Sequence, residues 1–509
     1  MLTWLILLPV LGALVVLLVP RRRSEVILPL GTALSVLPLA LAGYVFAVFE
    51  PVADYQFVER AVWWEPWGIS WYLGLDGISM PLVVLTTILV PISLAASASI
   101  TERRKEFVVY TLILEAATLG VFMALDLFFF FVFFEAVLVP MYFIIGIWGS
   151  ERRRYAAIKF FLYTAFGSAL LLAAIIAMAV LHASQFGSPS FALEDLMNLD
   201  FGPTASVLLF CALALAFAIK VPVFPLHTWL PDAHVEAPTA GSVLLAGVML
   251  KLGTYGLMRF NLSLFPQVAV DWVPVLAVLA VIGIIYGAVV AIVQPDLKKL
   301  IAYTSVSHLG FIVLGTFALT SGGLQGAVIQ NVNHGITTGG LFLLVGMIYD
   351  RRHTKQIAEF GGLQKVMPLY AGFFLFMTFA SIGLPGLNGF VGEFLVLVGS
   401  FTSLPVFAAL AAVGVVLAAI YLLWAYERVF TGVPEKEENL ALSDLDAREV
   451  GVLLPLAVLA LVLGLYPKVL LDKIEPSTEA LLDHVEASTD YEVPAPGRVA
   501  DVFLTGGGR

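Results

Sequence analysis

Long apolar stretches dominate this chain and restrict it to one class of fold. Hydropathy windows of about 20 residues, the length of a membrane-crossing helix, give fourteen candidate spans in the 509-residue sequence. Hydrophobic residues make up 60% of the chain and charged residues 13%, whereas soluble domains average about 45–50% and about 25%. We therefore expect an all-α integral membrane protein of about fourteen transmembrane helices. The spans lie near residues 2–20, 26–49, 78–100, 107–124, 127–148, 157–182, 205–225, 239–261, 272–293, 299–319, 324–349, 367–400, 404–430 and 450–468.

The charges between the spans alternate in sign. Loops after odd-numbered spans carry arginine and lysine, and loops after even-numbered spans carry mainly acids. The basic groups are Arg21–Arg23, Arg103–Lys105, Arg152–Arg154, Lys298–Lys299, Arg351, Arg352 and Lys355; the acids are Glu59, Glu65, Asp126, Glu194, Asp195, Asp200 and Asp271. Because cytoplasmic loops are enriched in basic residues, both termini are predicted on the outer side of a bacterial inner (cell) membrane.

The chain is expected to form a single polytopic membrane domain over residues 1–509. Leu2–Val19 leads directly into three arginines without a cleavage site, which indicates a membrane helix rather than a signal peptide. The longest polar stretches are expected to be connectors or partner surfaces: Pro51–Asp76, Thr431–Glu449 and a C-terminal tail over 469–509. In that tail, Pro494, Pro496 and Gly506–Gly508 predict partial disorder.

Composition also limits the partners and cofactors of the chain. Cys211 is the one cysteine, so the sequence has no disulfide framework and no cysteine set for haem, iron–sulfur clusters or zinc. The formal net charge of -10 comes from few residues and gives no indication of nucleic-acid binding. We expect no nucleic-acid partner, no metal and no cofactor in this chain, with the lipid bilayer as its environment.

Six ionisable side chains interrupt the apolar spans, each on a different span. They are Glu135, Lys220, Lys251, His308, His334 and Glu393. A charge at the centre of a membrane helix costs roughly 2.5–3.5 kcal/mol on insertion scales and by default marks a functional site. Taken singly, a Glu–Lys pair can be a structural clamp and a histidine a satisfied core residue. Six together, with acids and bases mixed, favour a path for protons, because clamps alone would be a costly way to hold an apolar bundle together.

The chemistry of these groups suits proton transfer. Burial disfavours the charged form of a lysine, and a nearby glutamate restores it, so a changing Glu135–Lys220 contact would switch the protonation of Lys220. Histidine titrates near neutral pH and can relay protons. Glu393 could load and release protons at the far end of the row. Such a row moves protons without any redox centre.

Interrupted helices and equal spacings suggest internal repeats. Pro222 and Pro225 break the seventh span beside Lys220, and the segment 384–389 breaks the twelfth, as in transporters with discontinuous helices. The offset from Glu135 to His308 is 173 residues, equal to that from Lys220 to Glu393. These offsets predict two inverted five-helix repeats, over 107–261 and 272–430. Pro222 and Pro385 are 163 residues apart, so the breaks do not follow the same offset.

A polar segment follows the seventh span and contains His227, Asp232, His234 and Glu236. The spacing matches no zinc template, which argues against a metal site. With Pro231 and Pro238 we expect a loop of rigid turns that forms a cytoplasmic mouth for proton uptake. A structural loop, with capping and turn roles for its polar side chains, is the alternative.

These motifs resemble the antiporter-like subunits of respiratory complex I (NADH–quinone oxidoreductase) over roughly residues 76–427. The resemblance is carried by FFE at 133–135, KVPVFPLHTWLPDAHVEAPT at 220–239, SVLLAGVMLK at 242–251, DLKKLIAYTSVSH at 296–308 and NHG at 333–335. Glutamate at 393, where the sister subunits L and N usually place lysine, is typical of subunit M.

The resemblance implies a fourteen-helix proton channel with inverted repeats. Glu135 and Lys220 would be the coupled pair, Lys251 and His308 the central relay, and Glu393 the terminal group. It also implies L-type and N-type neighbours in the membrane, with FMN, iron–sulfur clusters and quinone on partner subunits. Alternatives are a subunit of a multisubunit sodium/proton antiporter, the equivalent subunit of a hydrogenase-type or photosynthetic relative, and a structural scaffold with an inactive channel.

Overall fold

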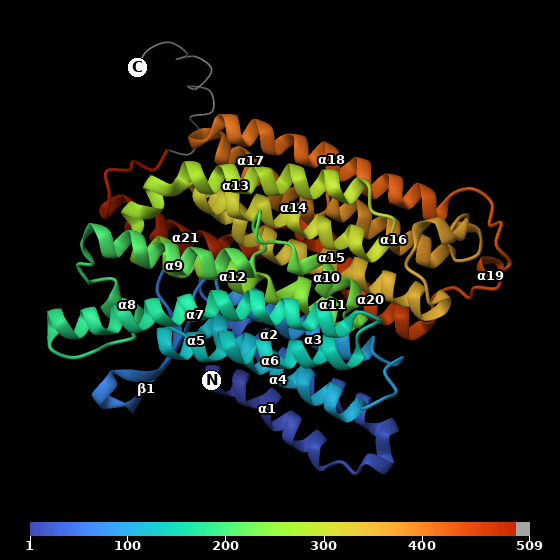
Figure 1. Ribbon diagram of the computed structural model, residues 1–509, viewed down its shortest axis with the longest axis horizontal. Coiled ribbons are helices and arrows are strands. Elements are labelled where there is room, and N and C mark those ends of the chain that lie inside the picture. Colours follow the sequence, from blue (N-terminus) through green and yellow to red (C-terminus); the bar gives the residue numbers. More distant parts are fainter. Residues whose placement is uncertain (495–509) are drawn as a thin grey trace.

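The computed structural model describes residues 1–494 and is a bundle of helices aligned with the long axis of the molecule (Figure 1). The N-terminal half comprises α1 (Leu2–Leu18), α2 (Ser24–Val48), α3 (Met80–Ala95), α4 (Arg104–Met123), α5 (Leu127–Ala136), α6 (Leu138–Trp148), α7 (Arg153–Phe186), α8 (Leu193–Leu196), α9 (Gly202–Lys220), α10 (Trp229–Glu236), α11 (Thr239–Leu244) and α12 (Lys251–Gly256). The C-terminal half comprises α13 (Pro266–Ile292), α14 (Leu297–Phe317), α15 (Ser321–Arg352), α16 (Pro368–Ser381), α17 (Asn388–Ser403), α18 (Pro405–Phe430), α19 (Glu437–Leu440), α20 (Ala447–Leu465) and α21 (Lys468–Ala487).

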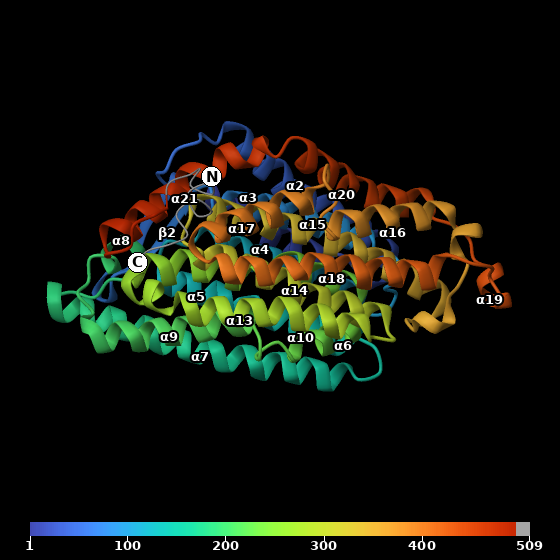
Figure 2. The ribbon, with the colours of Figure 1, turned by 90° about the horizontal axis from the view of Figure 1, so that it is seen from above.

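The expected all-helical membrane architecture is confirmed. Within the described residues, eleven helices are long and apolar enough to cross a membrane. Three shorter apolar helices, α1, α3 and α16, fall on other predicted spans. The central helix α15 is buried along most of its length, and α14 and α17 pack against it. Peripheral helices such as α7 and α18 expose apolar side chains, as a lipid-facing layer requires (Figure 2).

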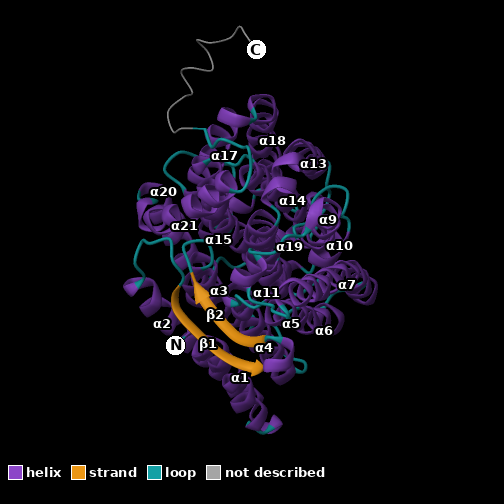
Figure 3. Cartoon of the chain, turned by 90° about the vertical axis from the view of Figure 1, so that its left-hand side faces the viewer, coloured by secondary structure: helices purple, strands orange, loops and turns teal. Residues whose placement is uncertain are grey.

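Two polar stretches have more structure than the sequence suggested. Pro51–Asp76 contains an antiparallel hairpin of β1 (Gln56–Trp64) and β2 (Ile69–Leu75), which lies at one end of the bundle (Figure 3). The predicted tail begins with α21, which buries Leu470, Ile474 and Leu481 at helical spacing. The first part of the tail is therefore an amphipathic helix, because its apolar residues form a helical stripe and the rest of its surface is polar. Pro496 and Gly506–Gly508 lie outside the described residues.

The two ends of the bundle differ in charge. The predicted basic loops lie at the end opposite the hairpin (Figure 1). The N-terminal ammonium is bonded to the Glu59 carboxylate on β1, and the Tyr491 hydroxyl donates to the Leu319 carbonyl at 3.1 Å. Both ends of the described chain therefore lie at the hairpin end, which agrees with the prediction that the termini share one side.

Close backbone contact joins α15 and α17, the helices that carry His334 and Glu393. A Cβ added at Gly399 would lie 2.1 Å from the backbone nitrogen of Gly323. Membrane helices approach closely where small residues face each other, because packing rather than water exclusion drives their association. The glycine at 399 thus lets these two helices meet.

We expect Gly399→Ala to destabilise the purified protein by about 1–3 kcal/mol, the usual range for overpacking a close-packed site. The midpoint of thermal unfolding in detergent measures this. Gly43→Ala on α2 is the matched control, because nothing lies within 4 Å of a Cβ at that position. Equal midpoints for the two variants would contradict close α15–α17 packing.

Candidate functional site

Four of the six predicted ionisable residues form a connected row in the centre of the bundle. The Lys251 ammonium on α12 donates to His334 Nδ1 on α15 at 2.6 Å. The His308 ring on α14 meets Glu393 Oε1 on α17 through Nδ1, also at 2.6 Å. The two histidine rings have centroids 5.9 Å apart. All four side chains are buried, so the row runs from α12 to α17 without reaching the surface.

Neutral polar side chains hold the row in place. Gln330 donates to Glu393 Oε1 at 3.1 Å, and the Ser381 hydroxyl lies 3.3 Å from His308 Nε2. Asn333 donates to the Asn388 carbonyl at 2.7 Å, at the start of α17. Since Ser381 ends α16 and Asn388 begins α17, the break in span twelve lies directly beside the His308–Glu393 pair. The predicted interruption is confirmed, and it brings backbone polar groups to the row.

Irregular helix surrounds Lys251. Two π-helical turns, η3 (Leu245–Met249) and η4 (Leu257–Leu262), flank the short α12. The Lys251 ammonium also donates to the Ala246 carbonyl inside the first of these turns. π turns of this kind occur frequently at functional sites. A carbonyl and an imidazole therefore solvate the buried ammonium where water is scarce.

Lys220 and Glu135 lie in the other half of the bundle. Lys220 is the last residue of α9, and the Trp229 indole donates to the neighbouring Ile219 carbonyl at 2.9 Å across the break. The Lys220 ammonium lies 4.8 Å from the centre of the Phe134 ring, a cation–π distance. Span five is also interrupted, because α5 ends at Ala136, the residue whose carbonyl faces the missing N–H of Pro140.

The predicted Glu135–Lys220 contact is absent in this conformation. No ion pair within 4.0 Å joins these two described residues, although the Glu135 charge acts on Lys220 through space. Glu135 Oε1 is buried without a hydrogen-bond partner among the described residues. The aromatic ring that the Lys220 ammonium faces belongs to Phe134, the residue directly before Glu135.

The segment from His227 to Glu236 is mostly a helix, so the expectation of a loop was wrong. Trp229–Glu236 forms α10, because Pro231 falls in its first turn, where a missing N–H costs nothing. Asp232 pairs with Lys159 at 2.7 Å, and the Glu236 carboxylate accepts from the Arg152 amide at 2.9 Å. These two acids thus hold α10 against α7 and the loop before it.

The two histidines of this segment are buried, not exposed at a mouth. The His227 ring lies against Tyr286, with centroids 5.1 Å apart, and His234 stacks on Phe342 at 4.6 Å. All four ring nitrogens are buried without a hydrogen-bond partner among the described residues. The His234 ring interacts electrostatically with both Lys251 and Lys298. Lys251 belongs to the central row and Lys298 to the basic end of the bundle, so the His234 ring is influenced by the charges of both.

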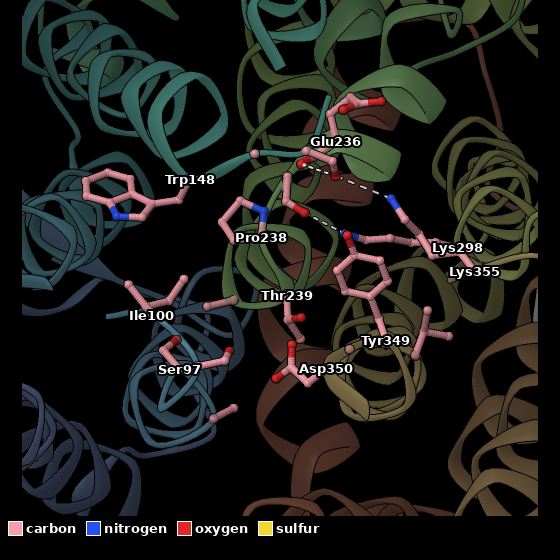
Figure 4. A pocket seen from close by; sticks show the side chains of 18 of the residues that line it. Ser97, Ile100, Trp148, Glu236, Pro238, Thr239, Lys298, Tyr349, Asp350 and Lys355 are labelled. Atoms are coloured by element: carbon pink, nitrogen blue, oxygen red, sulfur yellow. Dashed lines mark hydrogen bonds between the residues drawn. The ribbon is translucent and has the colours of Figure 1, made fainter. Parts of the chain in front are cut away.

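A cavity of about 290 Å³ opens at that basic end (Figure 4). Its walls include Glu236, Lys298, Asp350, His353 and Lys355. In Figure 4 the two lysines reach from one side toward the end of α10, opposite Trp148. The Lys298 ammonium donates to the Ala237 carbonyl at 2.5 Å, and Lys355 donates to the Val235 carbonyl at 2.7 Å. Two cations thus cap the C-terminal end of α10, where carbonyls lack helix partners.

Several residues of the site were not singled out from the sequence. Lys298 was assigned to a basic loop, but it lies in the first turn of α14 and is 6% exposed. Gln330, Asn333 and Ser381 are not ionisable, so a search for charged and titratable side chains in the apolar spans passes over them. The helical spacing of Gln330, Asn333 and His334 along one face of α15 was the available signal. Among residues 1–494 no group of three His, Cys, Asp or Glu side chains is arranged to hold a metal.

Comparisons with known proteins agree with this geometry. The family described as "NADH:quinone oxidoreductase/Mrp antiporter, TM" matches residues 124–420, and "NADH-ubiquinone oxidoreductase chain 4, amino terminus" matches residues 55–125. NADH-quinone oxidoreductase subunit M of Rhodobacter capsulatus is 46% identical over 457 residues, covering 88% of both chains. This chain belongs to the subunit M (chain 4) family of NADH-quinone oxidoreductase. The NADH-ubiquinone oxidoreductase chain 4 of Marchantia polymorpha is 42% identical, over 95% of this chain and 97% of that protein.

Solved structures show the same family fold. A chain of respiratory complex I from Thermus thermophilus with bound NADH superposes with a TM-score of 0.86 and 35% identity, covering 95% of this chain and 100% of that one. A chain of the Mrp complex from Dietzia sp. superposes with a TM-score of 0.84 at 22% identity, a likeness of fold alone. The expected resemblance to subunit M is confirmed.

Proposed function

We propose that this chain is the proton-translocating M-type membrane subunit of an NADH–quinone oxidoreductase. The observation that carries the proposal is the buried row of Lys251, His334, His308 and Glu393, in which two hydrogen-bonded pairs meet with their histidine ring centroids 5.9 Å apart inside an apolar bundle. Because the chain belongs to the subunit M family, we expect other subunits of the same complex to carry out the electron transfer. The chain itself contributes proton transfer.

The row supports proton transfer in both directions. A proton on the Lys251 ammonium can pass to His334 Nδ1 along their 2.6 Å hydrogen bond. His334 Nε2 has no partner among the described residues, and one water molecule or a ring turn would connect it to His308. His308 then passes a proton to Glu393 through its Nδ1 contact. Since every group is buried, the charge of each one depends on its neighbours.

Glu135 and Lys220 form the coupled pair of the other half. Closing the gap between them would stabilise the Lys220 ammonium, and opening it would favour proton release. The breaks between α5 and α6 and between α9 and α10 place a joint in the helix beside each residue. Movement of these joints, driven from elsewhere in the complex, would therefore change the protonation of Lys220.

The cavity at the basic end is the proposed site of proton uptake. Lys298 lies in the cavity wall, and His234 interacts with both Lys298 and Lys251. Protons would pass from the cavity by way of His234 to Lys251. His227, Asp232 and Glu236 would then have a structural role and support α10. This corresponds to the structural alternative considered for this segment in the sequence.

The remaining features follow from membership of complex I. We propose fourteen membrane spans in two inverted five-helix repeats, L-type and N-type neighbours in the membrane, and a bacterial inner membrane with both termini outside. FMN, iron–sulfur clusters and quinone would lie on partner subunits. The sequence assigns no redox centre to this chain.

A subunit of a multisubunit sodium/proton antiporter is the second candidate, supported by the fold of the Mrp complex. A dehydrated sodium ion needs several oxygen ligands close together. Glu115, Glu135 and Glu393 lie on three different helices, and Glu393 is already bonded to His308 and Gln330. This separation favours proton transfer.

Purification of the assembly that contains this chain decides between the candidates. We expect NADH-driven quinone reduction, and acidification of liposomes that is insensitive to sodium. An assembly without NADH oxidation that exchanges sodium for protons would establish the antiporter instead.

Glu135→Gln is expected to reduce proton pumping by at least about tenfold, because the neutral side chain no longer changes the charge state of Lys220. Lys220→Ala should do the same. Pumping is measured by dye quenching in liposomes at equal amounts of assembled complex. Glu115→Gln, a matched buried carboxylate outside the row, should keep near-normal pumping. Normal pumping by assembled Glu135→Gln complex would refute the coupled-pair mechanism.

Lys251→Ala should also lower pumping by about tenfold, since it removes the donor to His334. NADH-driven quinone reduction by the coupled complex should fall in parallel, while NADH oxidation with an artificial acceptor stays unchanged. Lys365→Ala, at an exposed lysine outside the bundle core, is the control. Unaltered coupled turnover in Lys251→Ala would show that protons bypass this residue.

Lys298→Gln tests uptake through the cavity. Glutamine can still donate to the Ala237 carbonyl but carries no proton, so we expect pumping to fall about tenfold with normal assembly. Lys299→Gln, one residue along the same helix and less buried, should leave pumping unchanged. If both variants pump normally, uptake occurs elsewhere.

A further inference from the structure

A second buried charge cluster lies at the hairpin end, outside the proton row. It consists of Arg259 in the π turn η4, Asp76 before α3, and the hydroxyls of Tyr55 and Tyr255. The Arg259 guanidinium forms an ion pair with Asp76 and donates to the Tyr55 hydroxyl at 2.9 Å. Its Nε donates to the Tyr255 hydroxyl at 3.3 Å. Arg259 is 5% exposed and Asp76 is 3% exposed, so the ion pair itself is buried, while Tyr55 is partly buried at its edge.

This cluster lies on the same helix face as the central relay lysine. Lys251, Tyr255 and Arg259 follow one another at intervals of four residues along a fully buried segment. Eight residues of helix correspond to about 12 Å. Strand β2 of the hairpin ends at Leu75, directly before Asp76, so the ion pair joins η4 to the segment that leads out of the hairpin. Any proton that left Lys251 along this face would therefore meet the cluster.

The hydrogen bonds of the cluster cannot carry a proton through it. The Tyr255 hydroxyl donates to the Phe122 carbonyl at 3.2 Å and accepts from Arg259 Nε. A guanidinium has only donors and does not release a proton in proteins. Burial raises the pKa of the Tyr55 hydroxyl, which therefore stays protonated. A relay that starts at Lys251 thus ends at Arg259.

The charges of the cluster also repel protons. Asp76 balances Arg259, but its other oxygen accepts from the backbone amides of Ile78 and Ser79 at the start of α3. A helix N-terminus contributes about half a positive charge. The charges of Arg259, Asp76 and the N-terminus of α3 add up to a net positive charge. Fixed positive groups of this kind exclude protons and cations from membrane pores.

We propose that Arg259 and Asp76, with Tyr255, form an electrostatic seal between Lys251 and the hairpin end of the bundle. The seal prevents a proton on Lys251 from leaking along α12 and directs it to His334 and on to Glu393. Arg259 is thus a positioning residue for proton transfer, and the inference rests on the proposed translocation function. The seal gives proton transfer along the row a direction, from Lys251 toward Glu393, which the hydrogen bonds of the row do not determine by themselves.

The sign of the charge separates a seal from a structural clamp. Arg259→Gln and Asp76→Asn remove the same ion pair, so a clamp predicts equal effects. A seal predicts unequal effects: Arg259→Gln leaves a carboxylate that attracts protons and raises the leak, whereas Asp76→Asn leaves a guanidinium that repels protons and keeps the path closed. One unit of charge at about 12 Å changes proton occupancy by about tenfold at an effective dielectric constant of about 20.

The experiment measures passive proton leak into liposomes that contain the purified complex. An imposed potassium diffusion potential drives the leak, and a trapped pH dye reports it without NADH. We expect Arg259→Gln to leak about tenfold faster than the wild type, with Asp76→Asn and Arg259→Lys as tight as the wild type. Tyr55→Phe, which removes one hydrogen bond from the guanidinium without changing the net charge, should also remain tight.

Equal leak in Arg259→Gln and Asp76→Asn, or no leak in either, would overturn the seal. If Arg259→Gln fails to assemble, the double variant Arg259→Gln with Asp76→Asn replaces it and should leak more than Asp76→Asn alone. Because the leak is measured without turnover, its result is independent of whether Glu135→Gln and Lys251→Ala stop pumping. Failure of the seal and failure of the translocation function are therefore separate outcomes.

Discussion

A charged or polar group inside a membrane bundle needs a partner from the protein itself, and this requirement organises the whole structure. Hydrocarbon offers no hydrogen bonds, so an unpaired buried group costs several kcal/mol. Lys251 meets the requirement through His334 and the Ala246 carbonyl, and Glu393 through His308 and Gln330. Each partner comes from a different helix or turn, so satisfying the charges also fixes which helices are neighbours.

The same requirement explains where the helices are irregular. A regular helix pairs its own carbonyls and leaves none for a neighbouring side chain. The breaks after Lys220 and before Asn388, and the π turns around Lys251, place irregular backbone beside ionisable residues. These are also the places where small movements change the partner of a charge. Irregular backbone thus provides carbonyl groups that solvate buried charges, and it allows those charges to change partners. For both reasons it lies beside the ionisable residues rather than at the lipid-facing surface.

The sequence predicted the central residues better than their surroundings. Charges stand out against apolar spans, so Lys251, His308, His334 and Glu393 were identified from composition and position alone. The structure joins them in pairs that spacing could not assign, since residues 83 and 85 positions apart meet across helices. The separation of Glu135 from Lys220 and the buried position of Lys298 were missed, because each depends on packing between segments distant in sequence. The helical form of α10 was missed because a proline in the sequence suggests a turn, whereas Pro231 lies in the first turn of the helix.

By itself the sequence determined the membrane class, the approximate positions of the helices, the two interrupted spans and the family. These features depend on local hydropathy, on proline and glycine, and on motifs that are continuous along the chain. Only the tertiary structure decided which ionisable groups touch, which polar residues solvate them, and where the cavity and the Arg259–Asp76 cluster lie. The physical reason is that a buried charge is stabilised by whatever surrounds it in space, and in a helical bundle those neighbours come from other helices.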